Sequence, residues 1–185
     1  MIVIGITGTL GAGKGTIVEY LVNEKGFDHY SVRTFLIKEI EKRGMTVNRD
    51  SMTSVANEMR AIHSASYITD CLYEEALLQG KSCVIESIRT AGEIESLRKK
   101  GSFTLFAVDA KPEIRYQRIQ QRKSETDAVS FEVFLSNEKR EMTSSDPNKQ
   151  NLNACIQQAD YVFSNDGNIT ALFNQIEKVL KQLNP

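Results

Sequence analysis

Nine residues near the N-terminus have the composition and spacing of a loop that binds phosphate. The segment Gly8-Thr-Leu-Gly-Ala-Gly-Lys-Gly-Thr16 follows a short apolar run and contains Gly-x4-Gly-Lys, in which the lysine is Lys14. Glycines let successive backbone N–H groups turn toward one anion, and the N-terminus of a following helix adds a partial positive charge. The pattern therefore predicts a site for nucleotide phosphates with these contacting residues: Gly11, Ala12, Gly13, Lys14, Gly15 and Thr16.

The position after Lys14 matters for a metal ion, because a serine or threonine usually stands there and binds Mg²⁺. Gly15 has no hydroxyl, so Thr16, carboxylates and water must share this task. Two carboxylates end apolar runs, namely Glu86 after Cys-Val-Ile and Asp109 after Leu-Phe-Ala-Val. We favour Glu86, because an arginine follows it three residues later. The expected Mg²⁺ ligands are therefore Thr16 and Glu86.

The Gly-Lys-Gly-Thr sequence at residues 13–16 resembles that of adenylate kinase and related nucleoside monophosphate kinases. The resemblance covers nearly the whole chain and includes a variant group with Asp-Gly-Ile-Arg, where this chain has Glu86-Ser-Ile-Arg89. No Asn-Lys-x-Asp guanine motif occurs, which argues against a GTPase. The resemblance implies ATP as the phosphoryl donor, Mg²⁺ as its metal, and a small nucleotide as the acceptor.

The resemblance also assigns roles to three arginines. Arg89 corresponds to the arginine that binds the phosphate of the acceptor, a task that suits the bidentate guanidinium fork. Arg118 and Arg122 match the Arg-x3-Arg of adenylate kinase lids, in which cations neutralise the transferring phosphoryl group. Only a short stretch follows them before the next apolar residues, so we expect a short, zinc-free lid over residues 118–130.

Two other regions are interpreted through the same resemblance. The segment Asn165-Asp-Gly167 corresponds to a loop whose backbone lies beside the adenine of ATP, so we expect Asn165 and Gly167 to contact the donor. In the acceptor region, residues 31–37 lack the Asp and Arg of adenylate kinases. Arg33 and Arg60 are proposed as substitutes from their charge and region alone.

Short apolar runs must position these residues, and helical patterns separate them. Five runs are expected to be strands, at residues 2–6, 29–32, 83–85, 103–108 and 161–163. Buried strands that alternate with helices predict a parallel sheet covered on both faces. Asp50 is expected to cap the helix that carries Val55 and Met59. The expected fold is an α/β, three-layer P-loop NTPase with a five-stranded parallel sheet, one domain over residues 1–185, and a helical acceptor-binding region at 34–80.

Composition excludes several classes of protein. The chain has 185 residues, of which 41% are hydrophobic and 25% charged, so it is not a disordered or low-complexity protein. A net charge of −1 gives no general basic field for nucleic acid. No apolar run is long enough to span a membrane, and no signal peptide is evident. Three scattered cysteines argue against disulfides and zinc, so we expect a cytoplasmic protein.

Three functions remain open from the sequence. The first is transfer of the γ-phosphoryl group of ATP to a nucleoside or deoxynucleoside monophosphate. The second is transfer to a hydroxyl, as in dephospho-CoA kinases, although residues 31–34 offer no carboxylate as a base. The third is a module that binds nucleotide without efficient transfer. The sequence does not specify the oligomeric state.

Overall fold

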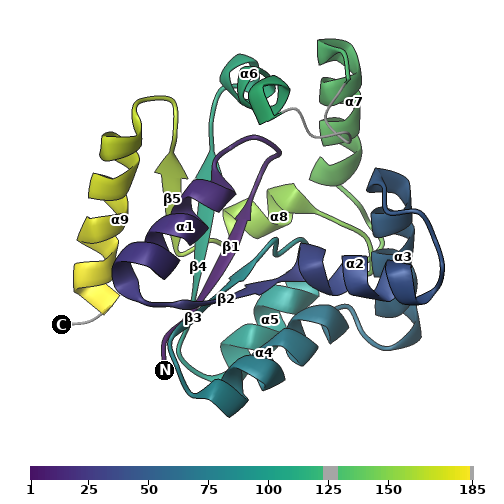
Figure 1. The fold of residues 1–185 in the computed structure, drawn as a ribbon, viewed down its shortest axis with the longest axis horizontal. Helices are drawn as coiled ribbons and strands as arrows, with labels where there is room; N and C mark the ends of the chain where they lie inside the picture. Colours follow the sequence, from purple (N-terminus) through teal and green to yellow (C-terminus); the bar gives the residue numbers. More distant parts are fainter. Residues whose placement is uncertain (123–128, 184–185) are drawn as a thin grey trace.

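The computed structural model describes residues 1–122 and 129–183, and its centre is one parallel β-sheet (Figure 1). The strands lie in the order β2-β3-β1-β4-β5, and every neighbouring pair is parallel. Their bounds are β1 Val3–Gly8, β2 Asp28–Ser31, β3 Cys83–Glu86, β4 Phe103–Asp109 and β5 Tyr161–Ser164. The five expected strands and the expected sheet are therefore confirmed.

The central place of β1 positions the phosphate-binding segment. Its register pairs Ile6 with Glu86 of β3 on one side and with Phe106 of β4 on the other. Parallel strands end at the same edge, and ligands of open α/β sheets bind outside that edge. The segment after Gly8 and the segment after Glu86 consequently leave the sheet side by side.

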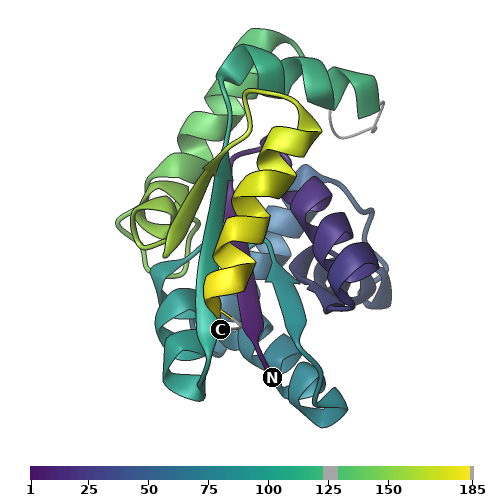
Figure 2. The same ribbon diagram turned by 90° about the vertical axis from the view of Figure 1, so that its left-hand side faces the viewer.

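Helices cover both faces of the sheet and form two hydrophobic cores. Along β1, Ile4 and Ile6 face the core beneath helices α1 (Lys14–Lys25) and α9 (Ile169–Leu183), whereas Val3 faces the other core. The opposite face is covered mainly by α4 (Tyr67–Gln79), α5 (Ala91–Lys100) and α8 (Leu152–Gln157). Figure 2 shows the strands between these helical layers, so the three-layer α/β prediction is confirmed.

Three helices lie between β2 and β3, in the region expected to bind the acceptor. They are α2 (Val32–Lys42), α3 (Arg49–Ile62) and α4. The N-cap of α3 is Asn48, so the expectation of Asp50 was wrong. Asn48 accepts from the backbone N–H of Ser51 at 2.8 Å, while the Ser51 hydroxyl accepts from the Asn48 N–H at 3.0 Å. This reciprocal capping box starts the helix two residues earlier and leaves Asp50 in its first turn.

Helices α6 (Pro112–Arg122) and α7 (Phe131–Met142) lie beyond the carboxyl ends of the strands (Figure 1). Part of the expected lid, residues 123–128, lies outside the described residues. The buried Arg115 of α6 pairs with Glu138 of α7 through two guanidinium nitrogens, which ties these two helices together. Arg115 also donates from Nε to the carbonyl of Ala110 at 2.6 Å, so it stabilises the start of α6.

The structure bears on two features that the sequence analysis considered, membrane-spanning helices and disulfide bonds. No helix in residues 1–122 and 129–183 is both long and apolar enough to cross a membrane. All three cysteines fall within these ranges and carry free thiols.

Candidate functional site

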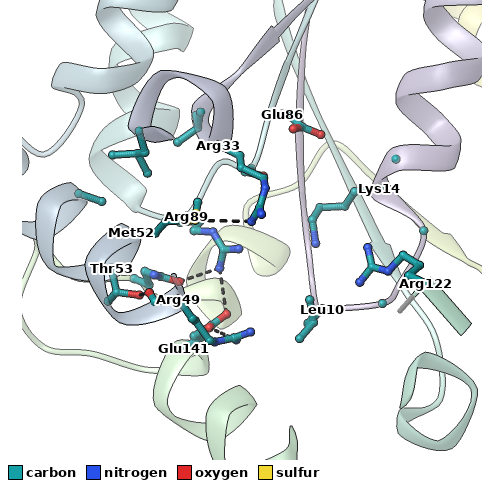
Figure 3. Close-up of a pocket in the computed structure, with 18 of the residues that line it drawn as sticks. Leu10, Lys14, Arg33, Arg49, Met52, Thr53, Glu86, Arg89, Arg122 and Glu141 are labelled. Atoms are coloured by element: carbon teal, nitrogen blue, oxygen red, sulfur yellow. Dashed lines mark hydrogen bonds and ion pairs between the residues drawn. The ribbon is translucent and has the colours of Figure 1, made fainter. Parts of the chain in front are cut away.

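A cavity of about 800 Å³ opens at the carboxyl edge of β1 and β3. One of its walls is the Gly-rich loop with the start of α1, and the facing wall is made by α2 and α3. Helices α6 and α7 and the loop after β3 complete it. Figure 3 shows Lys14, Arg33, Arg89 and Arg122 with their charged ends directed into this space. The cavity therefore gathers cations from four separate segments around the phosphate-binding loop.

The loop owes its shape to glycine at two crowded positions. Gly8 has φ +138°, and a Cβ there would lie 2.1 Å from the carbonyl oxygen of Val108. Gly13 has φ +106°, and a Cβ there would lie 2.3 Å from Nδ2 of Asn165. Side chains are excluded at both positions by sterics and by backbone conformation.

The ammonium group of Lys14 is held by the backbone of the loop. Its Nζ donates to the carbonyl oxygens of Gly8 at 2.7 Å and Thr9 at 2.8 Å. Withdrawal of the ammonium from water, reinforced by the nearby Arg89 guanidinium, lowers the pKa of Lys14 to about 7. A group held in this way gains its full charge when an anion enters the loop.

Thr16 and Glu86 both line the cavity, and their binding of a shared metal ion stays a prediction. The Glu86 carboxylate accepts from the Ser31 hydroxyl at 2.7 Å and lies 3.6 Å from Nε2 of His29. Burial opposes ionisation of Glu86, but the hydrogen bonds from His29 and Ser31 outweigh it and keep its pKa below the usual range. His29 therefore contacts a candidate site residue.

Arg89 and Arg33 each keep one edge of the guanidinium free of other described residues. Arg89 uses Nη1 for both of its side-chain contacts, to Glu141 at 2.9 Å and to Gln150 at 2.6 Å. Arg33 likewise uses Nη1, toward the sulfur of Met52 at 3.5 Å. The edge formed by Nε and Nη2 remains available in both residues, and this edge binds the two oxygens of an oxyanion in parallel.

Arg118 lines the cavity and also supports the loop after β5. Its Nη2 donates to the carbonyl of Asn165 at 2.8 Å, whereas its buried Nη1 has no partner among the described residues. Arg122 lines the same wall one helical turn later. Arg140 is exposed and bonds to Asn137, and it is not among the described residues that line the cavity.

Comparison with known proteins places this site in a family. A family model described as an AAA domain matches residues 4–144. A UPF0200 protein of Pyrobaculum aerophilum is 30% identical over 185 residues, which covers 98% of each chain. The chain belongs to the AAA domain family and to the UPF0200 proteins. A further UPF0200 protein, from Methanococcus maripaludis, is 28% identical over 186 residues, with 99% of this chain and 98% of the relative covered.

Solved structures show the same fold as this UPF0200 chain at low sequence identity. TT1252 from Thermus thermophilus aligns with a TM-score of 0.64 at 20% identity, covering 100% of this chain and 98% of that protein. Shikimate kinase from Bacteroides thetaiotaomicron aligns with a TM-score of 0.63 at 13% identity, covering 100% and 99%. These neighbours support the P-loop kinase-like architecture.

Asn165 and Gly167, the residues expected to contact adenine, lie in the loop between β5 and α9. The Asn165 side chain is 6% exposed, and its Nδ2 donates to the carbonyl of Ala12 at 2.8 Å. Asn165 therefore stabilises the phosphate-binding loop through a hydrogen bond to its backbone. Gly167 is exposed in the turn before α9, and neither residue is among the described residues that line the cavity. Their contact with adenine stays a prediction.

Arg60 lines the cavity, and its side chain is almost fully buried. Its charge alone did not indicate this burial. The side chain is 1% exposed and its Nη2 bonds to the fully buried Glu93 at 3.0 Å. Charged residues are rarely buried unless paired, and here the pair lies beneath the loop that carries Arg89.

Sequence reasoning missed Arg49 and Glu141 in this UPF0200 site. The two oxygens of the Glu141 carboxylate bind Arg49 and Arg89, one each, and the cavity reaches all three residues. Burial opposes ionisation of Glu141, but these two arginines keep its pKa low. Arg49 could have been found, because residues 49, 53, 56 and 60 share one helical face. Glu141 carries no comparable signal, since only tertiary structure brings α7 to α3.

Ser87 is the one described residue other than glycine with positive φ, at +68°. It stands between Glu86 and Arg89, and such strain persists where a site requires the backbone path. Replacement by glycine is expected to raise the free energy of unfolding by about 0.5–1 kcal/mol, because relief of strain exceeds the entropic cost of glycine. Urea denaturation measures this change. The matched control is Ser54→Gly on the exposed face of α3, which should lower stability. Equal losses in both variants would contradict the interpretation.

Proposed function

We propose that the protein transfers the γ-phosphoryl group of ATP to a small nucleotide, specifically a nucleoside or deoxynucleoside monophosphate. One observation carries this proposal. The cavity has a phosphate-binding loop on one side and, facing it, two arginines whose side-on edges are free of other described residues. Two phosphate sites across one cavity are what transfer between two phosphorylated substrates requires.

On the donor side, the loop amides and Lys14 would hold the β- and γ-phosphates of ATP. Lys14 already lies in the loop, so anion binding has only to draw Nζ away from the carbonyls of Gly8 and Thr9. Arg118 and Arg122 would add positive charge from α6 as the phosphoryl group moves. Electrostatic stabilisation of this kind is the main contribution that proteins make to phosphoryl transfer.

On the acceptor side, Arg89 and Arg33 would hold the accepting phosphate through their free Nε–Nη2 edges. Glu141 and Gln150 fix Arg89 from its other edge, so little side-chain entropy is lost when the phosphate binds. A phosphate acceptor is already ionised and needs no general base. This agrees with the lowered pKa of Glu86, which makes that carboxylate a weak base.

The residues at the loop fit Mg²⁺ in the way that this ion is usually bound. Thr16 offers a hydroxyl and Glu86 an ionised carboxylate, both hard oxygen ligands. No group of three or more His, Cys, Asp or Glu side chains in residues 1–122 and 129–183 could hold a metal ion, so waters and substrate phosphates would have to complete the ligands of a Mg²⁺ ion at Thr16 and Glu86. When bound, Mg²⁺ supplies charge neutralisation to the phosphates of the donor.

A panel of acceptors tests the proposal. The purified protein with ATP and Mg²⁺ is given AMP, CMP, UMP, GMP, dTMP or dephospho-CoA, and ADP and the phosphorylated product are both measured. Transfer to at least one monophosphate is expected. Product from dephospho-CoA alone would instead favour a hydroxyl acceptor. Tight ATP binding with no ADP from any acceptor would identify a non-catalytic module.

The lowered pKa of Lys14 predicts that the protein takes up a proton when nucleotide binds. With a pKa of about 7 it is mostly neutral at pH 8 in the free protein, and the added phosphates should raise its pKa and restore the charge. ATP binding at pH 8 should then take up about one proton, and less at pH 6, where Lys14 is already charged. Calorimetry in two buffers of different ionisation enthalpy measures this uptake. Lys14→Met should abolish it, and unchanged uptake in that variant would assign the proton elsewhere.

A further inference from the structure

One face of α3 forms a continuous wall of the cavity. Its residues recur at steps of three and four and carry a cation at each end: Arg49, Met52, Thr53, Ala56 and Arg60. Arg60 lies eleven positions after Arg49 in the helix, a rise of about 16 Å. The wall is therefore longer than a single phosphate requires.

Arg89 connects the two ends of this wall, one through its backbone and the other through its side chain. At one end, its backbone N–H donates to the Glu93 carboxylate at 2.7 Å, and Glu93 holds Arg60. At the other end, its guanidinium meets the Glu141 carboxylate, which holds Arg49. Arg60 consequently lies at the opposite end of the Arg89 side chain from the guanidinium assigned to the accepting phosphate.

Arg60 has hydrogen-bond donors that no described residue satisfies. Its Nη2 bonds to Glu93, but Nε and Nη1 are buried without a partner. The second oxygen of Glu93 accepts from the backbone N–H groups of Arg89 and Thr90, and neither carboxylate oxygen is a partner of Nε or Nη1 of Arg60. The ion pair balances the charge, so the remaining N–H groups call for a hydrogen-bond acceptor and do not require a second anion.

Apolar side chains line the same cavity as Arg60 and Arg89. They are Met52 and Ala56 from α3 and Val32 and Leu36 from α2. The Thr53 hydroxyl donates to the carbonyl of Arg49 at 2.9 Å, so its proton is already used. An apolar lining of this kind suits a flat ring, and methionine packs well against aromatic faces.

We propose that Arg60 forms a second subsite for the acceptor, which binds the base through hydrogen-bond acceptor atoms. This inference rests on the proposed function and refines it. A base with a carbonyl oxygen, namely uracil, cytosine or guanine, presents acceptors to the guanidinium N–H groups. Adenine has ring-nitrogen acceptors but no carbonyl oxygen, and its amino group beside such a nitrogen would place an N–H group against a guanidinium N–H group. Arginine commonly makes a paired contact with the carbonyl oxygen and the neighbouring ring nitrogen of guanine.

Arg60→Lys tests the subsite while keeping the ion pair with Glu93. The lysine ammonium retains the charge but lacks the Nε and Nη1 donors. The dissociation constant and KM for the preferred monophosphate should rise about tenfold or more, with KM for ATP unchanged. In the unaltered protein, CMP, UMP or GMP should bind about tenfold more tightly than AMP, and the variant should lose this preference.

Calorimetric measurement of monophosphate affinity, compared with the transfer assay, separates the proposed reaction from the proposed Arg60 subsite. Base preference in binding without any transfer would leave the subsite standing and overturn the proposed reaction. Transfer with equal affinity for all four bases, or with no change in Arg60→Lys, would overturn the subsite alone. Failure of every monophosphate to bind would overturn both. The preference of the unaltered protein needs no variant, so the test holds even if Arg60→Lys does not fold.

Discussion

Lys14→Ala is expected to reduce turnover about a hundredfold to a thousandfold, with little change in the melting temperature. The loss follows from removing one charged donor to the developing phosphoryl charge, which typically costs this much. The fold should persist, because the hydrogen bonds of Lys14 to described residues go to two carbonyls of its own loop, those of Gly8 and Thr9. Initial-rate kinetics with saturating ATP and the best acceptor measure the effect.

The control for this prediction is Lys25→Ala, at the other end of α1. Lys25 pairs with Glu177 at 2.6 Å and does not line the cavity. Its removal tests whether loss of any cation from the helix slows the reaction, and turnover should stay close to that of the unaltered protein. Near-normal turnover in Lys14→Ala would show that the Gly-rich loop does not hold the donor.

Gly13→Ala is expected to damage both the loop and nucleotide binding. A Cβ would lie 2.3 Å from Nδ2 of Asn165, and Asn165 cannot move away without losing its bond to the carbonyl of Ala12. Positive φ adds to this cost, so the free energy of unfolding should fall by about 2 kcal/mol. Affinity for ATP should weaken about tenfold or more, because each 1.4 kcal/mol of distortion costs a factor of ten. Denaturation and calorimetry measure the two effects.

The chain provides a matched control two residues later. Gly15 lies in the first turn of α1, and a Cβ there meets nothing within 4 Å. Gly15→Ala should keep or raise stability, because alanine favours the helix. If Gly13→Ala proved as stable as Gly15→Ala, the close approach of Asn165 to the loop would not be a constraint.

The parts of the fold that local patterns determine could be predicted. The apolar run of β1, the glycines after it, and the amphipathic α9 each depend on neighbours within a few residues. The alternation of strands and helices then implies a parallel sheet. Even here a cap was misplaced, because Asn48 and Ser51 form a reciprocal pair that a single residue type does not reveal.

The arrangement of the site depends on contacts between distant residues, and these could not be predicted. Arg60 was assigned from charge, but its burial follows from a pairing with Glu93, 33 residues away. Glu141 lies 52 residues from Arg89 and 92 from Arg49, so no local periodicity connects them. The side chain of Asn165 supports the loop 153 residues earlier, a contact that the family motif did not indicate, while the contact of its backbone with adenine stays a prediction.

The support of the loop by Asn165 has a consequence for the order of events on the ribosome. The Gly-rich segment is synthesised first, but β1 can pair on its two sides only after β3 and β4 have been synthesised. The hydrogen bond from Asn165 to the carbonyl of Ala12 can form only later, after β5 has been synthesised. Nascent chains arrested before residue 165 should therefore retain ATP poorly even when the first four strands have emerged. Affinity for nucleotide should therefore appear late in translation, when β5 and α9 have emerged from the ribosome.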